Sequence, residues 1–204
     1  MAVKHELARD LLAIKAVQIN PIEYFTWTSG IKSPIYCDNR LTMSHPVVRR
    51  KITDAFVQII EEMDEKPEVI AGCATAGIPH AAWLADSLNL PMVYVRSKPK
   101  GHGKGNQIEG QLEKNKKVLV IEDLISTGGS SIEAAKALQQ EGAEVTGVLA
   151  IFTYGLPKSK QAFSDVSLPL HTITNFDELV EALMEDGEIK EEDRIKLIEW
   201  RDEL

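Results

Sequence analysis

Short apolar runs alternate along this chain with segments in which apolar residues recur every three or four positions. The dense apolar runs predict buried strands at residues 68–71, 91–95, 118–121 and 145–151. The periodic segments predict helices at residues 46–63, 78–88 and 130–141. Because strands and helices follow one another in this order, we expect an α/β fold with a parallel-sheet core and helices on both faces.

The two ends of the chain have different patterns. Residues 4–17 have apolar positions near helical spacing, so they predict a helix. Residues 20–40 are rich in Pro, Gly, Ser, Thr and aromatic residues, which favour short strands and turns. Residues 175–204 predict two amphipathic helices around Gly187. We expect a single domain, with these parts: an N-terminal helix and small N-terminal unit over about 1–40, an α/β core over about 46–170, and C-terminal helices over about 175–204.

The composition excludes several classes of function. With 23 Lys and Arg against 31 Asp and Glu, the formal net charge is −8, which opposes general binding to nucleic acids or anionic membranes. The two cysteines, Cys37 and Cys73, form no CxxC pair, so we expect neither a zinc site nor a disulfide framework. No apolar run is long enough to predict a membrane span or a secretion signal, and we expect a cytoplasmic protein.

A basic segment, residues 96–110, follows the second predicted strand. Glycines alternate in it with the cationic residues Arg96, Lys98, Lys100 and Lys104 and with His102. Such a segment packs poorly in a core, so we expect a mobile loop that can close over a small anion. A solvated charged loop is the alternative, but charge alone gives no reason for the alternating glycines.

The segment after the third predicted strand carries the most specific chemistry. Glu122 and Asp123 end that strand, and a turn of hydroxyl residues and glycines leads to a helix that begins near Ser130. Carboxylates accept hydrogen bonds from sugar hydroxyls, and a helix N-terminus offers free N–H groups to a phosphate. The alternative is an ordinary helix capped by Ser130, which would not explain two acids followed by Thr-Gly-Gly-Ser.

This segment resembles the signature with which type I phosphoribosyltransferases bind phosphoribosyl pyrophosphate (PRPP). In that family the acids hold the ribose hydroxyls and the turn holds the 5-phosphate. The resemblance assigns PRPP binding to Glu122, Asp123, Leu124, Ile125, Ser126, Thr127, Gly128, Gly129 and Ser130.

Three further stretches resemble the orotate phosphoribosyltransferases, in particular those of Gram-positive bacteria. Residues 24–40 resemble their N-terminal hood, although a hairpin with core aromatic residues is the alternative. Residues 72–79 resemble the pyrophosphate loop, with Ala76 where many members have lysine; a tight strand-to-helix turn is equally compatible. Residues 94–106 resemble the catalytic loop, in which Arg96, Lys100 and His102 match residues that bind PRPP.

The resemblance implies transfer of ribose 5-phosphate from PRPP to orotate, which gives orotidine 5'-monophosphate in pyrimidine biosynthesis. It implies catalytic roles for Lys100, His102 and Asp123, a magnesium ion held mainly through PRPP rather than by the protein, and a homodimer with shared active sites. Ser126 is expected to contact orotate. Many members bind the orotate carboxylate with an arginine after the fourth strand, but residues 153–158 contain none. Backbone amides, Ser126 or Lys158 must then hold orotate, or the base is not orotate. The alternatives are a transferase for another base and a PRPP-sensing regulator without activity.

Overall fold

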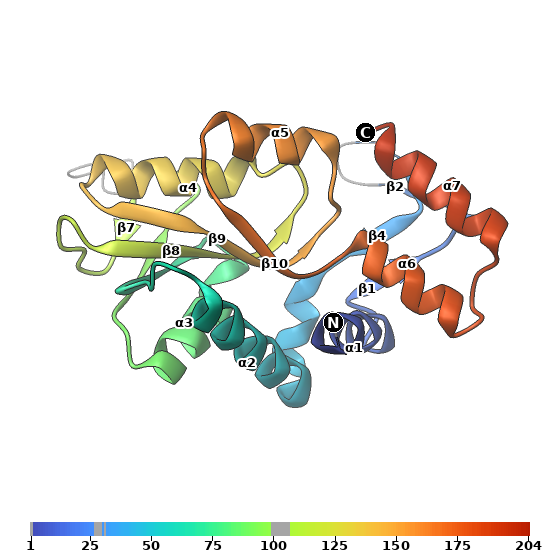
Figure 1. Ribbon diagram of the computed structural model, residues 1–204, viewed down its shortest axis with the longest axis horizontal. Coiled ribbons are helices and arrows are strands. Elements are labelled where there is room, and N and C mark those ends of the chain that lie inside the picture. Colours follow the sequence, from blue (N-terminus) through green and yellow to red (C-terminus); the bar gives the residue numbers. More distant parts are fainter. Residues whose placement is uncertain (1, 27–29, 31, 99–106) are drawn as a thin grey trace.

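A six-stranded sheet, in the order β10-β9-β8-β5-β6-β7, forms the centre of the computed structural model (Figure 1). The structure describes residues 2–26, 30, 32–98 and 107–204. The strands of this sheet are β5 (Val69–Cys73), β6 (Met92–Val95), β7 (Ile108–Glu109), β8 (Lys117–Ile125), β9 (Glu144–Thr153) and β10 (Leu170–Asn175). Neighbouring strands pair in parallel except β6 and β7, which are antiparallel. The predicted parallel core is confirmed, with one antiparallel strand at its edge.

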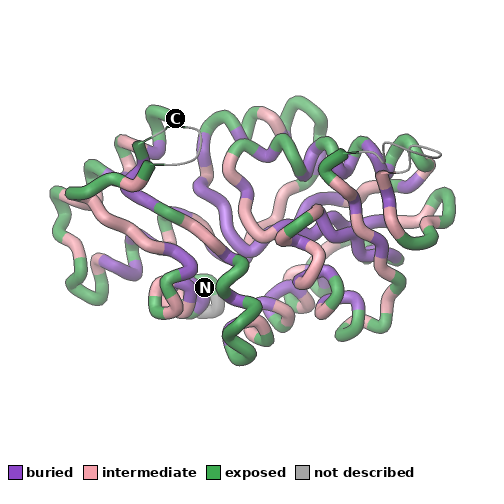
Figure 2. Tube along the Cα trace, turned by 180° about the vertical axis from the view of Figure 1, so that it is seen from behind, coloured by how far each residue is buried: buried purple, intermediate pink, exposed green. Residues whose placement is uncertain are grey.

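Helices cover both faces of this sheet (Figure 1). One face carries α2 (Pro46–Glu62) and α3 (Gly77–Leu88), and the other carries α4 (Gly129–Gln140) and α5 (Pro157–Asp165). Side chains of β8 alternate between the two layers: Leu119 and Ile121 pack into one buried cluster, and Val118 and Val120 pack into the other. The central strands β5, β8 and β9 are therefore buried over most of their length, and buried segments run through the middle of the molecule in Figure 2.

The N-terminal and C-terminal segments meet at one end of the sheet. Helix α1 (Ala2–Ala13) precedes two small antiparallel pairs, and the 3-10 helix η1 (Asn39–Ser44) follows them. The pairs are β1 (Val17–Ile19) with β4 (Ile35–Cys37), and β2 (Phe25–Thr26) with β3 (Lys32–Ser33). Helices α6 (Phe176–Glu185) and α7 (Glu191–Asp202) flank Gly187, as predicted. The indole Nε1–H of Trp200 on α7 donates to the carbonyl oxygen of Lys32, 3.3 Å away.

Several predicted boundaries are wrong for identifiable reasons. The first helix does not reach residue 17, because Lys15 adopts φ +59° and Val17 begins β1. The basic segment does not stay a loop to residue 110, because β7 pairs with β6 and buries Ile108. Helix α5 and strand β10 were not predicted.

No helix in the described ranges is both long and apolar enough to span a bilayer.

Candidate active site

Glu122 and Asp123 lie inside β8 rather than after it. The predicted strand end at residue 121 is wrong because β8 continues to Ile125, which pairs with Thr153 of β9. Glu122 is only 6% exposed; its Oε1 accepts from the backbone N–H of Asp123 at 3.0 Å, and its Oε2 accepts from the Ser130 hydroxyl at 3.5 Å. Burial raises the pKa of Glu122 to about 8 and also raises the pKa of Asp123. Burial and the neighbouring carboxylate thus both disfavour full ionisation of the pair.

The turn between β8 and α4 leaves a helix N-terminus open. The residue that caps α4 is Gly128, with φ +82°, and it makes no side-chain hydrogen bond to the helix. The predicted helix start near Ser130 is confirmed, whereas the alternative of a helix capped by Ser130 is wrong. A Cβ atom at Gly128 would lie 2.5 Å from the ring of Phe163, so both the backbone angle and the packing require glycine. The first N–H groups of α4 have no partner within the helix and suit an anion.

One small cleft brings together the turn and the start of the basic segment. Its volume is about 180 Å³, and Arg96, Ser97, Gly129 and Ser130 are among the residues that line it. Arg96 Nη1 lies 3.4 Å from a carboxylate oxygen of Glu109, which orients the guanidinium from the β7 side. The cleft joins a cation to a helix N-terminus, which is the combination that a phosphorylated ligand requires.

Two predicted catalytic residues of the basic segment, Lys100 and His102, lie outside the described residues.

Packing explains part of the need for small residues in the loop after β5. A Cβ atom at Gly77 would overlap the carbonyl oxygen of Ile121 and would lie 3.2 Å from the Cα of Glu122. The absence of a side chain therefore lets α3 approach β8 directly beneath the acid pair. The peptide bond between Ala74 and Thr75 is cis, and Ala74 lines the small cleft. Both the strand-to-helix turn and the anion-binding interpretation thus fit this loop.

The N-terminal hood presents aromatic residues at its surface rather than in the core. The ring centroids of Phe25 and Tyr36 are 5.9 Å apart, and Tyr36 is 40% exposed. A hairpin built around core aromatic residues is therefore the wrong interpretation. Burial raises the pKa of Tyr154, and the negative charge of Asp123 raises it further. The backbone N–H of Tyr154 donates to the carbonyl oxygen of Ile125, 3.2 Å away, at the end of the strand that holds the acid pair.

Asn39 is a site residue that the sequence interpretation did not identify. Its side chain is buried, and its Nδ2–H donates to the backbone carbonyl of Asp123 at 2.7 Å. Its Oδ1 is buried without a hydrogen-bond partner in the described part of the chain. Asn39 therefore ties the end of the hood to the acid pair across 84 positions of sequence, a link that residue spacing cannot reveal.

The remaining predicted PRPP-binding residues differ in exposure and in the groups that they can present to a ligand. Ile125 is buried in the core, and its carbonyl accepts from Tyr154 N and from Thr153 Oγ1. Leu124 and Ser126 are half-buried, and Thr127 is exposed. Thr127 and Ser126 can therefore present hydroxyls, whereas the side chain of Ile125 cannot reach a ligand. Among the described residues, no group of three or more His, Cys, Asp or Glu side chains is arranged to hold a metal.

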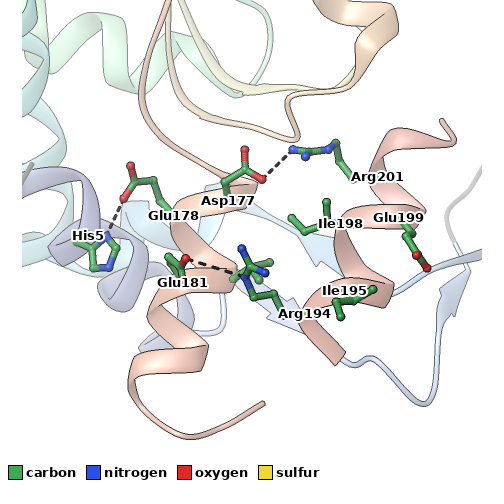
Figure 3. Close-up of a pocket in the computed structure, with 10 residues that line it drawn as sticks. His5, Asp177, Glu178, Glu181, Arg194, Ile195, Ile198, Glu199 and Arg201 are labelled. Carbon is green, nitrogen blue, oxygen red and sulfur yellow. Dashed lines mark hydrogen bonds and ion pairs between the residues drawn. The ribbon is translucent and has the colours of Figure 1, made fainter. Parts of the chain in front are cut away.

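A much larger cavity, of about 870 Å³, lies between α6 and α7 (Figure 3). It is lined by His5, Asp177, Arg194, Ile195 and Arg201, among others. Neither acid of β8 lines this cavity or the small cleft; of the two, the small cleft is the one lined by Arg96 and by the start of α4.

Known proteins resemble this chain over nearly its whole length. The family model described as a phosphoribosyl transferase domain matches residues 43–178. An orotate phosphoribosyltransferase of Oceanobacillus iheyensis is 64% identical over 199 residues, which are 98% of each chain. One of Staphylococcus haemolyticus is 56% identical over 199 residues, again 98% of each chain. The solved orotate phosphoribosyltransferase of Aeropyrum pernix is 28% identical, with a TM-score of 0.76 over 90% of this chain and 99% of that one.

Proposed function

This chain belongs to the phosphoribosyltransferase family and, within it, to the orotate phosphoribosyltransferases, and we propose how its residues carry out that reaction. The reaction transfers ribose 5-phosphate from PRPP to orotate and yields orotidine 5'-monophosphate and pyrophosphate. The observation that carries the proposal is the acid pair of β8, whose Glu122 accepts a hydrogen bond from Ser130 in the first turn of α4. Ser130 also lines the small cleft, together with Arg96.

We assign the ribose, the 5-phosphate and the pyrophosphate of PRPP to different residues at this edge of the sheet. Asp123 and Glu122, once ionised, accept hydrogen bonds from the two ribose hydroxyls. The N–H groups at the start of α4, together with Ser126, Thr127 and Ser130, hold the 5-phosphate. Because Arg96 lines the same cleft, it meets the pyrophosphate arm. Tyr36 and Phe25 cover the flat orotate ring from the hood.

Catalysis then consists mainly of positioning and electrostatics. The bond between C1 of the ribose and the pyrophosphate oxygen breaks as orotate N1 forms the new bond to C1, and positive charge develops on the sugar. The proton that orotate N1 loses balances the proton that the leaving pyrophosphate takes up. The carboxylates of Glu122 and Asp123 stabilise the charge on the sugar. Lys100 and His102 meet the leaving pyrophosphate, and either can donate a proton to it. Closure of the basic segment over the site would exclude water and limit hydrolysis of PRPP.

A magnesium ion fits this site only in company with PRPP. Carboxylate oxygens suit magnesium, but Glu122 and Asp123 alone are too few to complete six ligands. When bound, the ion would neutralise the pyrophosphate and so make it a better leaving group.

Two assays test the proposal. Orotate should be converted to orotidine 5'-monophosphate only when PRPP and magnesium are both present, and uracil, hypoxanthine and adenine should react far more slowly. Lys100→Ala should remove most of kcat, whereas Lys136→Ala, which alters a surface ion pair with Glu133, should not. Unchanged turnover of Lys100→Ala would exclude its assigned role, and a preference for another base would reassign the substrate.

A homodimer with shared active sites is also proposed, with a basic segment that reaches the site of the partner subunit. If so, two inactive variants, Lys100→Ala and Asp123→Asn, should recover activity when their subunits are exchanged. Random pairing leaves about one quarter of the sites intact. No recovery, although exchange is verified, would mean that each site is built from one chain.

A PRPP-sensing regulator is the second candidate, but the acidic C-terminal helices have the wrong charge for DNA. A cytoplasmic location stays a prediction.

A further inference from the structure

Orotate, the base in the proposed reaction, carries a carboxylate that must meet a positive charge when it leaves water. The segment after β9 offers little for this purpose. The Thr153 hydroxyl already donates to the carbonyl of Ile125, and Lys158 is exposed on α5. Two other cations near the hood also have partners: Arg40 binds both carboxylate oxygens of Asp38, and Lys32 donates to the Thr26 hydroxyl.

A buried arginine reaches this segment from a distant part of the chain. Arg201 lies in the last turn of α7, and its side chain is only 10% exposed. Its Nη1 lies 3.6 Å from the position that a Cβ atom would occupy on Gly155, which has φ +68°. A side chain at residue 155 would therefore be strained by the backbone angle, and its Cβ atom would lie in van der Waals contact with the guanidinium. The guanidinium of Arg201, on α7, thus lies beside Gly155, in the loop after β9.

The surroundings of Arg201 connect it to the loop after β9 and to the hood. Gly155 follows Tyr154, whose backbone N–H donates to the carbonyl oxygen of Ile125, two residues after Asp123 on β8. Trp200, which precedes Arg201, is bonded to the backbone of Lys32 in the hood. The last turn of α7 therefore contacts the hood and borders the loop after β9.

We propose that Arg201 is the specificity-determining residue that recognises the carboxylate of the base. This inference rests on the proposed function, because it names the side chain that binds the carboxylate of orotate.

The existing ion pairs of Arg201 do not use all the donors of its guanidinium. Nε donates to Asp202 at 2.6 Å and Nη1 to Asp177 at 2.9 Å, as Figure 3 shows for Asp177. The side chains of Asp177 and Asp202 are 60% and 58% exposed, so water screens their charges far more than it screens the guanidinium. In the ranges that the structure describes, no hydrogen bond is formed by Nη2. This nitrogen can therefore donate to a further carboxylate.

Product binding tests the inference without relying on turnover. Orotidine 5'-monophosphate carries the carboxylate, whereas uridine 5'-monophosphate lacks it and is otherwise identical. Calorimetry on the full chain should show that Arg201→Gln weakens binding of the first by about 10- to 100-fold, the range for a charged hydrogen bond. Binding of the second should change by less than about twofold.

Matched variants separate recognition from structural support. Asp177→Asn and Asp202→Asn each remove one ion pair of Arg201 but keep the cation, so binding of orotidine 5'-monophosphate should be preserved. Equal weakening of both nucleotides by Arg201→Gln, or the same loss in Asp177→Asn, would overturn the inference in favour of a structural role. If Arg201→Gln does not fold, Arg201→Met, which keeps the length of the side chain but removes the cation, decides by the same comparison: a loss confined to the carboxylate-bearing nucleotide supports the inference, and no difference overturns it. A wild-type chain that makes no orotidine 5'-monophosphate would instead refute the proposed function.

Discussion

Replacing Gly129 by alanine should weaken PRPP binding without destabilising the fold. A Cβ atom at Gly129 would meet no heavy atom within 4 Å, and the residue lines the cleft where α4 begins. The added methyl group therefore costs nothing in the ligand-free protein but intrudes where a phosphate must approach the backbone. Intrusion into a close-packed contact costs about 1–3 kcal/mol, which is roughly 5- to 150-fold in affinity.

Gly77→Ala is the matched control, because its methyl group meets protein rather than ligand. The new Cβ would overlap the carbonyl oxygen of Ile121, so α3 and β8 must move apart. We expect this overpacking to lower the free energy of unfolding by about 1–3 kcal/mol. For a chain of this size the melting temperature should fall by roughly 2–12 °C.

The assay combines thermal unfolding of the ligand-free variants with initial-rate kinetics at varied PRPP. Gly129→Ala should keep its melting temperature and raise the KM for PRPP, with the KM for orotate nearly unchanged. The reasoning fails if Gly129→Ala binds PRPP normally, or if its melting temperature falls as far as that of Gly77→Ala.

Three further predictions concern individual side chains of the site. Because burial raises the pKa of Glu122 to about 8 in the folded protein, the native state binds the extra proton, and stability should decline as pH rises from about 5 to 8. Melting temperatures measured without ligand should show this slope, and Glu122→Gln should flatten it; a slope unchanged by the substitution would contradict the assignment. Asn39→Ala removes the hydrogen bond to the backbone of Asp123, so kcat should fall about tenfold, as a loss of about 1–1.5 kcal/mol implies; unchanged kcat in steady-state assays would rule out this positioning role. Arg96→Ala should raise the inhibition constant of pyrophosphate about tenfold or more, whereas Glu109→Gln, which removes only its partner, should have a smaller effect; equal inhibition of the Arg96 variant and the wild type would exclude the contact.

Elements with a strong apolar pattern were predictable from the sequence, and those with a weak pattern were not. The four buried strands and the helices between them follow from dense apolar runs. Helix α5 was missed because Phe163 is its one large buried side chain, so its sequence lacks an apolar stripe. Strand β10 was missed because four of its six residues are polar, as suits a strand at the sheet edge.

The residues of the candidate site likewise fall into those that the local sequence predicts and those that it does not. The acid pair and the turn after it form one continuous motif, so local residue types were enough to identify them. Asn39 and Arg201 act through contacts with segments far away in the sequence, Asp123 and Gly155 respectively. Nothing in their local sequence marks such contacts, because the fold alone creates them. The position of the acids within β8 was also misjudged, since Leu124 and Ile125 continue the strand beyond them.

The most direct test of the account is equilibrium binding of ribose 5-phosphate, which contains the hydroxyls and the phosphate but neither the base nor the pyrophosphate. Calorimetric titration should show saturable binding to the wild-type chain and binding at least about tenfold weaker to Asp123→Asn. Glu199→Gln, on α7, should bind as the wild type does. Equal affinity of all three proteins for ribose 5-phosphate would contradict the assignment of the acid pair and the adjoining turn.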